Sequence, residues 1–244
     1  MYQSTNRHAP AKNAHTIEVQ IEIEFEDPRV RRAFMRKVFM IVWVQIIFSL
    51  IVIGLFVFVP TLNKYMRGNM MLFWIAFGVL LVLTILLGCF ESLRRQTPCN
   101  FFLLGLYTLT FSITLSFSCV RVPPEIIFTA LGITAAVVLI LILFALQTKI
   151  DFTVCGVGLF IAALLLCVFS LVAFFFPSKM MMVGICSIGV VLFSLYLIYD
   201  VQMMMGGTHR YTLSPEEYIF AAMSIYTDVM LIFMYIMDLL YLSS

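Results

Sequence analysis

Residues 214–238 read SPEEYIFAAMSIYTDVMLIFMYIMD, and this stretch decides the fold because it joins a helix start, an apolar span and an internal charge. Ser214 stands as an N-cap before Pro215 at the first helical position and Glu217 at the third, which is the capping-box pattern. The helix is therefore expected to begin at about Pro215. At ~1.5 Å per residue, Asp228 lies ~20 Å further along, deep in a membrane whose surface holds the cap.

The composition is that of an integral membrane protein. Of the 244 residues, 63% are hydrophobic and 11% are charged, and the mean hydropathy is +1.07. Soluble globular domains carry about 25% charged residues. The net charge of +2 is too small to indicate a nucleic-acid partner, so the lipid bilayer is the partner that the composition predicts.

Seven apolar runs are long enough to cross a membrane, which takes about 20 residues. They are read at residues 38–59, 70–90, 101–120, 125–146, 152–176, 180–200 and 216–242. Short polar connections separate them, for example residues 63–69 and 177–179. We therefore predict an all-α bundle of seven transmembrane helices over residues 38–244. It follows a cytosolic tail, residues 1–37, that is largely disordered to about residue 25.

The basic residues predict the orientation of the bundle. With the N-terminus in the cytosol, eleven Lys and Arg residues lie inside and four lie outside, as the positive-inside rule requires. The inside set is Arg7, Lys12, Arg29, Arg31, Arg32, Arg36, Lys37, Arg94, Arg95, Lys149 and Arg210, and the outside set is Lys64, Arg67, Arg121 and Lys179. Seven crossings then put the C-terminus in the lumen or outside the cell.

Asp200 and Asp228 lie in the last two apolar runs, where a carboxylate is costly. A charged side chain near the bilayer centre costs at least ~2.5 kcal/mol, so an intramembrane Asp normally faces a partner or a water-filled cavity. The alternatives are a solvated helix-end residue for Asp200 and a structural hydrogen bond for Asp228. Asp228 belongs to a helical stripe that is polar or small at six of its seven positions: Glu217, Ala221, Ser224, Asp228, Leu231, Tyr235 and Asp238.

The two carboxylates predict a proton- and cation-sensitive site. Two carboxylates in a low-dielectric site do not both ionise freely, so the pair is expected to titrate as a unit. Loss of the shared proton leaves a doubly charged site at Asp200 and Asp228. Its ligand atoms are all oxygen, which suits Ca²⁺ as the bound metal. Because Ca²⁺ prefers about six to eight oxygen ligands, water and backbone carbonyls have to supply the rest.

The remaining polar residues predict packing. The third run carries hydroxyls on all its faces, and hydroxyls in lipid bond backbone carbonyls or neighbouring helices. We interpret them as packing contacts first and as pore lining second: Thr108, Thr110, Ser112, Thr114, Ser116 and Ser118. The sequence shows no nucleophile cluster, metal cluster or phosphate-binding loop. We therefore expect neither an enzyme nor a resident cofactor, with calcium only as a permeant or transiently bound ion.

Three segments carry a resemblance to a known family. They are VRRAFMRKV at residues 30–38, QTKIDFT at residues 147–153, and LSPEEYIFAA at residues 213–222 followed by YTD at residues 226–228. These segments closely resemble the Lifeguard branch of the transmembrane BAX-inhibitor-motif family, and the resemblance runs from about residue 27 to residue 240. It implies a seven-helix protein of cellular membranes that lets Ca²⁺ leak down its gradient and suppresses apoptosis.

The resemblance also implies roles for individual residues. The aspartates of the last two helices form a pH-sensing dyad near the cytosolic end of the pore in that family, and they correspond to Asp200 and Asp228. A basic residue after the second helix binds the dyad as a latch in bacterial relatives, and Arg94 and Arg95 are both candidates here. Val201 and Leu231 stand where the family usually has Thr and Asn, which removes two polar side chains beside the dyad.

Three other classes of membrane protein are alternatives to the channel. An intramembrane aspartyl protease also pairs Asp residues on adjacent helices, but it is expected to carry a Gly-x-Gly-Asp motif, and residues 225–227 before Asp228 read IYT. A secondary transporter is expected to show repeated halves, which are not evident. A non-conducting scaffold that binds death-signalling membrane proteins remains an alternative. The endoplasmic reticulum, the Golgi and the plasma membrane all fit as locations.

Overall fold

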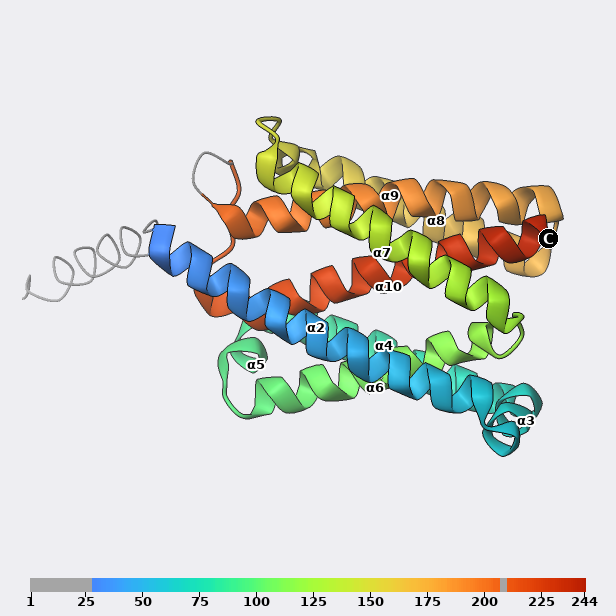
Figure 1. Cartoon of the computed structure of the whole chain (residues 1–244). Coiled ribbons are helices and arrows are strands. Elements are labelled where there is room, and N and C mark those ends of the chain that lie inside the picture. Colours follow the sequence, from blue (N-terminus) through green and yellow to red (C-terminus); the bar gives the residue numbers. More distant parts are fainter. Residues whose placement is uncertain (1–27, 207–209) are drawn as a thin grey trace, which may run out of the picture.

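Seven long helices form a bundle in the computed structural model, which describes residues 28–206 and 210–244 (Figure 1). All seven are long and apolar enough to cross a membrane, so the predicted all-α membrane bundle is confirmed. The disorder predicted up to about residue 25 lies outside the described residues. The spanning helices are α2 (Pro28–Phe58), α4 (Met70–Cys89), α6 (Cys99–Cys119), α7 (Pro124–Gln147), α8 (Gly156–Phe175), α9 (Lys179–Met205) and α10 (Tyr218–Ser243).

Helix α10 lies at the centre of the bundle. It packs against α9, α7, α2 and α6, and Figure 1 shows it running between α9 and α8 on one side and α6 and α4 on the other. In its apolar window 67% of the residues are buried, against 17% in the corresponding windows of α7 and of the α8 span. The last span therefore faces protein along most of its surface, which allows it to carry polar residues at membrane depth.

Helix α2 begins at Pro28, so the predicted boundary between tail and bundle at residues 37 and 38 falls inside a helix. The extra turns are held by tertiary contacts. Arg31, Phe34 and Val38 follow one another at helical spacing and are all buried. The guanidinium of Arg31 donates a 2.5 Å hydrogen bond to the carbonyl of Leu213, just before α10.

Gly206 makes this approach of Arg31 feasible. It ends α9 with φ of 63°, a conformation that favours glycine. A Cβ at this position would lie 2.7 Å from Nε of Arg31. The absence of a side chain at Gly206 therefore leaves room for the guanidinium against the end of α9.

The connection predicted at residues 63–69 is mostly helical. Helix α3 (Pro60–Gly68) begins with Pro60 in its first turn, where a missing N–H costs nothing. Arg67 bonds the carbonyl of Val120 at the end of α6. Residues 63–69 therefore have the polar composition of a turn, but most of them belong to a short helix that lies at this end of the bundle.

Hydroxyl groups join α2, α6 and α10 inside the membrane. On α6, Ser112 and Thr108 bond the backbone carbonyls four residues earlier, at 2.6 and 2.8 Å. Ser112 also bonds Ser49 of α2 at 2.9 Å, and Ser49 lies 2.7 Å from the hydroxyl of Tyr226 on α10. These hydroxyls act as packing contacts, which is the first of the two roles predicted for them.

Candidate functional site: a carboxyl pair between α9 and α10

The structure brings Asp200 and Asp228 together. Asp200 lies on α9 five residues before its end at Met205, and Asp228 lies on the facing α10, where it is 4% exposed. Their carboxyl groups are within hydrogen-bonding range of each other. This is the pairing that the sequence predicted from two separate apolar runs.

Asp228 has an unsatisfied oxygen. Its Oδ2 is buried and has no hydrogen-bond donor among the described residues. A buried oxygen left without a partner costs about 1–3 kcal/mol, and more when it is charged. A proton shared with Asp200, or a cation held between the two carboxyls, would satisfy it.

Phenol groups border the carboxyl pair. Tyr196, one helical turn before Asp200, interacts electrostatically with both aspartates. Tyr107 of α6 reaches the same region and shares a 2.7 Å hydrogen bond with Thr227, next to Asp228. The pair is therefore enclosed by three helices.

The two positions that depart from the family pattern carry no oxygen to this site. Val201 is fully buried in the main hydrophobic core, and Leu231 packs against that core from α10. Across residues 28–206 and 210–244, no cluster of three or more His, Cys, Asp or Glu side chains could hold a metal ion. A cation between Asp200 and Asp228 would therefore take most of its ligands from water and backbone carbonyls.

The candidate latch residues bind Glu217 in this structure. Nε of Arg94 lies 2.7 Å from Oε2 of Glu217, and Nε of Arg95 donates a 2.8 Å hydrogen bond to Oε1. Ion pairs of Arg95 with Glu216, at 3.3 Å, and with Glu91 complete the cluster. Among the ion pairs of the described residues, the expected pairing of either arginine with Asp200 does not occur.

The position of α5 explains this difference. The short helix α5 (Glu91–Arg95) places both guanidinium groups in contact with Glu217, directly before α10. Glu217 precedes Asp228 by eleven residues, or ~16 Å along a helix, so a side chain that reaches Glu217 stops about three turns short of the dyad. The hydrogen bond to Glu217 raises the pKa of Arg95, because it stabilises the charged guanidinium.

Glu217 consequently plays a different part from the one predicted. Ser214 caps the turn Pro215–Glu217 by accepting a 3.3 Å hydrogen bond from the backbone N–H of Glu216, as its N-cap position predicted. The side chain of Glu217 is turned to the arginines, however, and does not complete a capping box. Sequence alone could not show this, because the arginines lie more than 120 residues earlier in the chain.

Sequence reasoning also missed Gln202. This fully buried side chain donates a 2.9 Å hydrogen bond to the carbonyl of Ile150 and accepts a 2.8 Å bond from the N–H of Phe152. Between these two residues, Asp151 accepts hydrogen bonds from Thr153 and from the backbone N–H of Arg210. The connection between α7 and α8 is thereby fixed to the end of α9, two residues from Asp200.

Comparisons with known proteins agree with this architecture. The family model described as inhibitor of apoptosis-promoting Bax1 matches residues 31–244, a range that includes both aspartates. Protein lifeguard 3 of Mus musculus is 33% identical over 223 residues, which cover 88% of this chain and 71% of that protein. The Homo sapiens lifeguard 3 is also 33% identical, over 224 residues, which cover 89% of this chain and 71% of that protein. Protein lifeguard 4 of Mus musculus is 32% identical over 216 residues, which cover 86% of this chain and 85% of that protein.

Proposed function

This chain belongs to the family of inhibitors of apoptosis-promoting Bax1, and from this premise we propose that it is a pH-sensitive calcium leak channel. Membership makes it a multi-pass membrane protein of an anti-apoptotic family whose members are regulators rather than known enzymes. In this proposal, Ca²⁺ passes along α10, and Asp200 and Asp228 control its passage. A lower calcium content of the lumen would then dampen cell death.

The carboxyl pair is the observation that carries this proposal. Helices α9 and α10 hold two acidic groups against each other at membrane depth, and one oxygen of Asp228 has no donor within residues 28–206 and 210–244. Each buried carboxylate costs several kcal/mol in hydrocarbon, and such residues usually mark ion pathways or proton relays. A purely structural helix contact would be met more cheaply by hydroxyls such as those that join α2, α6 and α10.

Protonation of the pair supplies the pH response. A shared proton bridges the two carboxyls and leaves one negative charge, whereas loss of that proton leaves two. The doubly charged pair attracts a hard divalent cation and repels itself, which favours separation of α9 from α10. Calcium passage is therefore expected to follow the titration of the pair as a unit.

The arginine cluster supplies a closure at the entrance to this route. Glu217 and Asp228 belong to one stripe of α10 that is continued between them by Ala221 and Ser224. Arg94 and Arg95 join the Glu217 end of that stripe to α5 through ion pairs, so that the contact itself blocks this end of the route. We propose that this cluster replaces the predicted Asp200 latch as the element that limits resting leak.

The location and orientation form part of the proposal. The excess of basic residues at the end of the bundle that holds Arg94, Arg95, Lys149 and Arg210 favours a cytosolic N-terminus. The arginine cluster then faces the cytosol, in the endoplasmic reticulum, the Golgi or the plasma membrane. Death-signalling membrane proteins are the partners that the family name suggests.

Calcium flux through the purified protein tests the proposal. Liposomes that hold the wild-type chain should take up Ca²⁺ faster than protein-free liposomes. Asp228→Asn should change that flux, while Glu125→Gln, an exposed substitution at the start of α7, should not. Thermal unfolding of each variant in detergent checks that it is folded. Wild-type flux no faster than in protein-free liposomes would contradict the channel and favour a non-conducting scaffold.

A further inference from the structure

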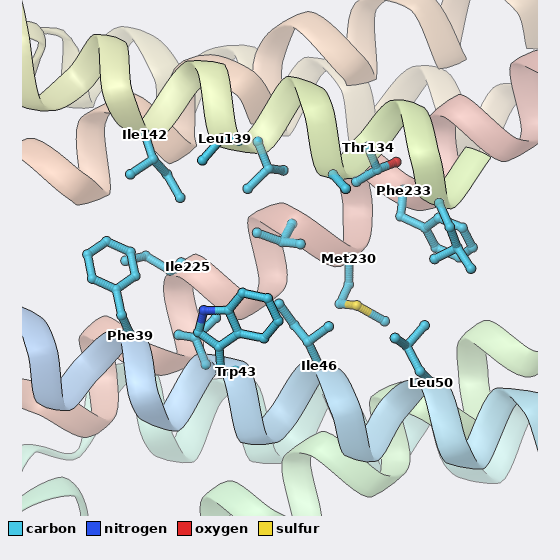
Figure 2. Close-up of a pocket in the computed structure, with 15 residues that line it drawn as sticks. Phe39, Trp43, Ile46, Leu50, Thr134, Leu139, Ile142, Ile225, Met230 and Phe233 are labelled. Carbon is cyan, nitrogen blue, oxygen red and sulfur yellow. The ribbon is translucent and has the colours of Figure 1, made fainter. Parts of the chain in front are cut away.

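A cavity of about 530 Å³ lies between α2, α7 and α10, away from the carboxyl pair (Figure 2). Phe39, Trp43 and Ile46 of α2 point into it from one side, and Leu139 and Ile142 of α7 point into it from the other. Residues of α10 form its floor. Its size falls within the ~300–1,000 Å³ range of small-molecule sites.

The cavity is open to the hydrocarbon of the bilayer. Trp43 and Leu139, which border it, are 66% and 59% exposed, and both belong to membrane-spanning helices. Thr134 contributes the one hydroxyl among the lining residues, and its Oγ1 has no hydrogen-bond partner among the described residues. All other lining side chains apart from the indole of Trp43 are hydrocarbon or thioether. An occupant that fits this chemistry is a flexible hydrocarbon chain.

Two arginines continue the cavity face of α2 towards its N-terminal end. Arg32, Arg36, Phe39 and Trp43 follow one another at spacings of four, three and four residues, which places them on one helical face. Arg32 and Arg36 are both exposed. Arg36 precedes Trp43 by seven residues, or ~10 Å, which is the separation between headgroup level and the upper part of an acyl chain.

We propose that this cavity binds one anionic phospholipid, with an acyl chain between α2 and α7 and the phosphate group at Arg36 and Arg32. Charge complementarity selects the headgroup, because basic residues beside a transmembrane helix attract anionic lipids. The volume excludes a helix from a second copy, since a transmembrane helix about 10–12 Å wide and ~30 Å long is several times larger than the cavity.

A lipid in this position would contact the helix that carries the carboxyl pair. Ile225 and Val229 line the cavity, and they stand three residues before and one residue after Asp228 on α10. The acyl chain would therefore pack on one face of α10 while Asp200 packs on another. Binding of the lipid does not depend on whether the protein conducts calcium, so the two proposals can fail separately.

Tryptophan fluorescence offers a direct test, because the chain has only two tryptophans. In a Trp74→Phe variant, Trp43 alone reports on the cavity, and in a Trp43→Phe variant, Trp74 on α4 reports on lipid elsewhere around the bundle. Each variant is reconstituted in vesicles that contain brominated phosphatidylserine or brominated phosphatidylcholine with bromine at the same chain position. The ratio of quenching by the two lipids then measures headgroup preference at each tryptophan, independent of its depth.

We expect Trp43 to be quenched preferentially by the brominated anionic lipid and Trp74 to show no such preference. Arg36→Gln should lower the preference at Trp43 about fivefold, the change expected from one arginine beside an anionic surface. Ala135→Phe, which fills the cavity from α7, should reduce quenching of Trp43 by both lipids. Lys179→Gln, an exposed basic residue at the start of α9, is the matched control and should change neither.

Three results would overturn the proposal. An equal anionic preference at Trp43 and Trp74 would indicate ordinary lipid around the whole bundle. A preference at Trp43 that survives Arg36→Gln together with Arg32→Gln would remove the headgroup site. Quenching of Trp43 that is unchanged in a folded Ala135→Phe variant would place the acyl chain outside the cavity, and the arginine variants still decide the matter if Ala135→Phe does not fold.

Discussion

Arg94 and Glu217 form an ion pair of 2.7 Å between Nε and Oε2, with side chains only 14% and 6% exposed, at the start of the helix that carries Asp228. Arg94 also donates hydrogen bonds to the carbonyls of Leu87 and Gly88 at the end of α4. One side chain therefore joins the last turn of α4 to the first turn of the central helix. Movement of α10 would have to break or carry this contact.

Loss of the Glu217 charge should loosen that junction. Glu217→Gln keeps the shape of the side chain but leaves the guanidinium of Arg94 buried without its counter-ion. Removing one partner of a buried pair typically costs about 3–5 kcal/mol, so we expect a clearly lower thermal unfolding midpoint in detergent. We also expect a higher resting Ca²⁺ leak in liposomes, because the entrance is no longer held closed.

Glu216→Gln is the matched control for this prediction. Glu216 is exposed, and among the described residues its ion pair is with the partly exposed Arg95, at 3.3 Å. Such surface pairs contribute about 0–1 kcal/mol. Equal unfolding midpoints and equal leak in the two variants would show that the buried pair neither stabilises nor closes the protein.

Gln202 should be essential for the connection between α7 and α8. Gln202→Leu leaves the carbonyl of Ile150 and the N–H of Phe152 without their partners, at about 1–3 kcal/mol for each buried group. We expect faster proteolysis within residues 147–155 and a lower unfolding midpoint. The exposed Gln147→Leu serves as the control, and a Gln202 variant that resists protease as well as this control would contradict the role given to the side chain.

The orientation of the bundle can be tested with a tag at Ser244. Because the charge distribution favours a cytosolic N-terminus and seven helices cross the membrane, proteases added to the cytosolic side of sealed vesicles should not remove this tag. A tag at the N-terminus should be removed under the same conditions. Removal of the Ser244 tag from intact vesicles would show that the last helix does not cross or that the bundle is inverted.

The sequence predicted the features that follow from hydropathy and from the rarity of intramembrane charge. Each spanning helix coincides with an apolar run, and the scarcity of acidic residues in these runs points to Asp200 and Asp228 without any knowledge of contacts. The first helix was placed ten residues too late, because contacts of Arg31 and Phe34 with distant segments stabilise its early turns. Local composition does not contain such contacts.

The features that were missed depend on partners far apart in the chain. Glu217 fits a local capping pattern, but its arginine partners come from α5, and only the fold brings them within 3 Å. Gln202 binds backbone atoms, which any sequence possesses, so no residue pattern identifies them. The cavity is lined by residues of α2, α7 and α10, so it depends on how these three helices pack. No pattern in the sequence predicts it.

The pH dependence of calcium flux tests the central claim most directly. Liposomes that contain wild-type protein are assayed for Ca²⁺ uptake across a pH series, beside Asp200→Asn and Asp228→Asn. Because Asn is nearly the same size as Asp and carries no titrating proton, each variant should stay folded and lose the pH dependence of the wild-type flux. If both variants keep the wild-type flux and the wild-type pH response, the carboxyl pair is structural and does not control calcium passage.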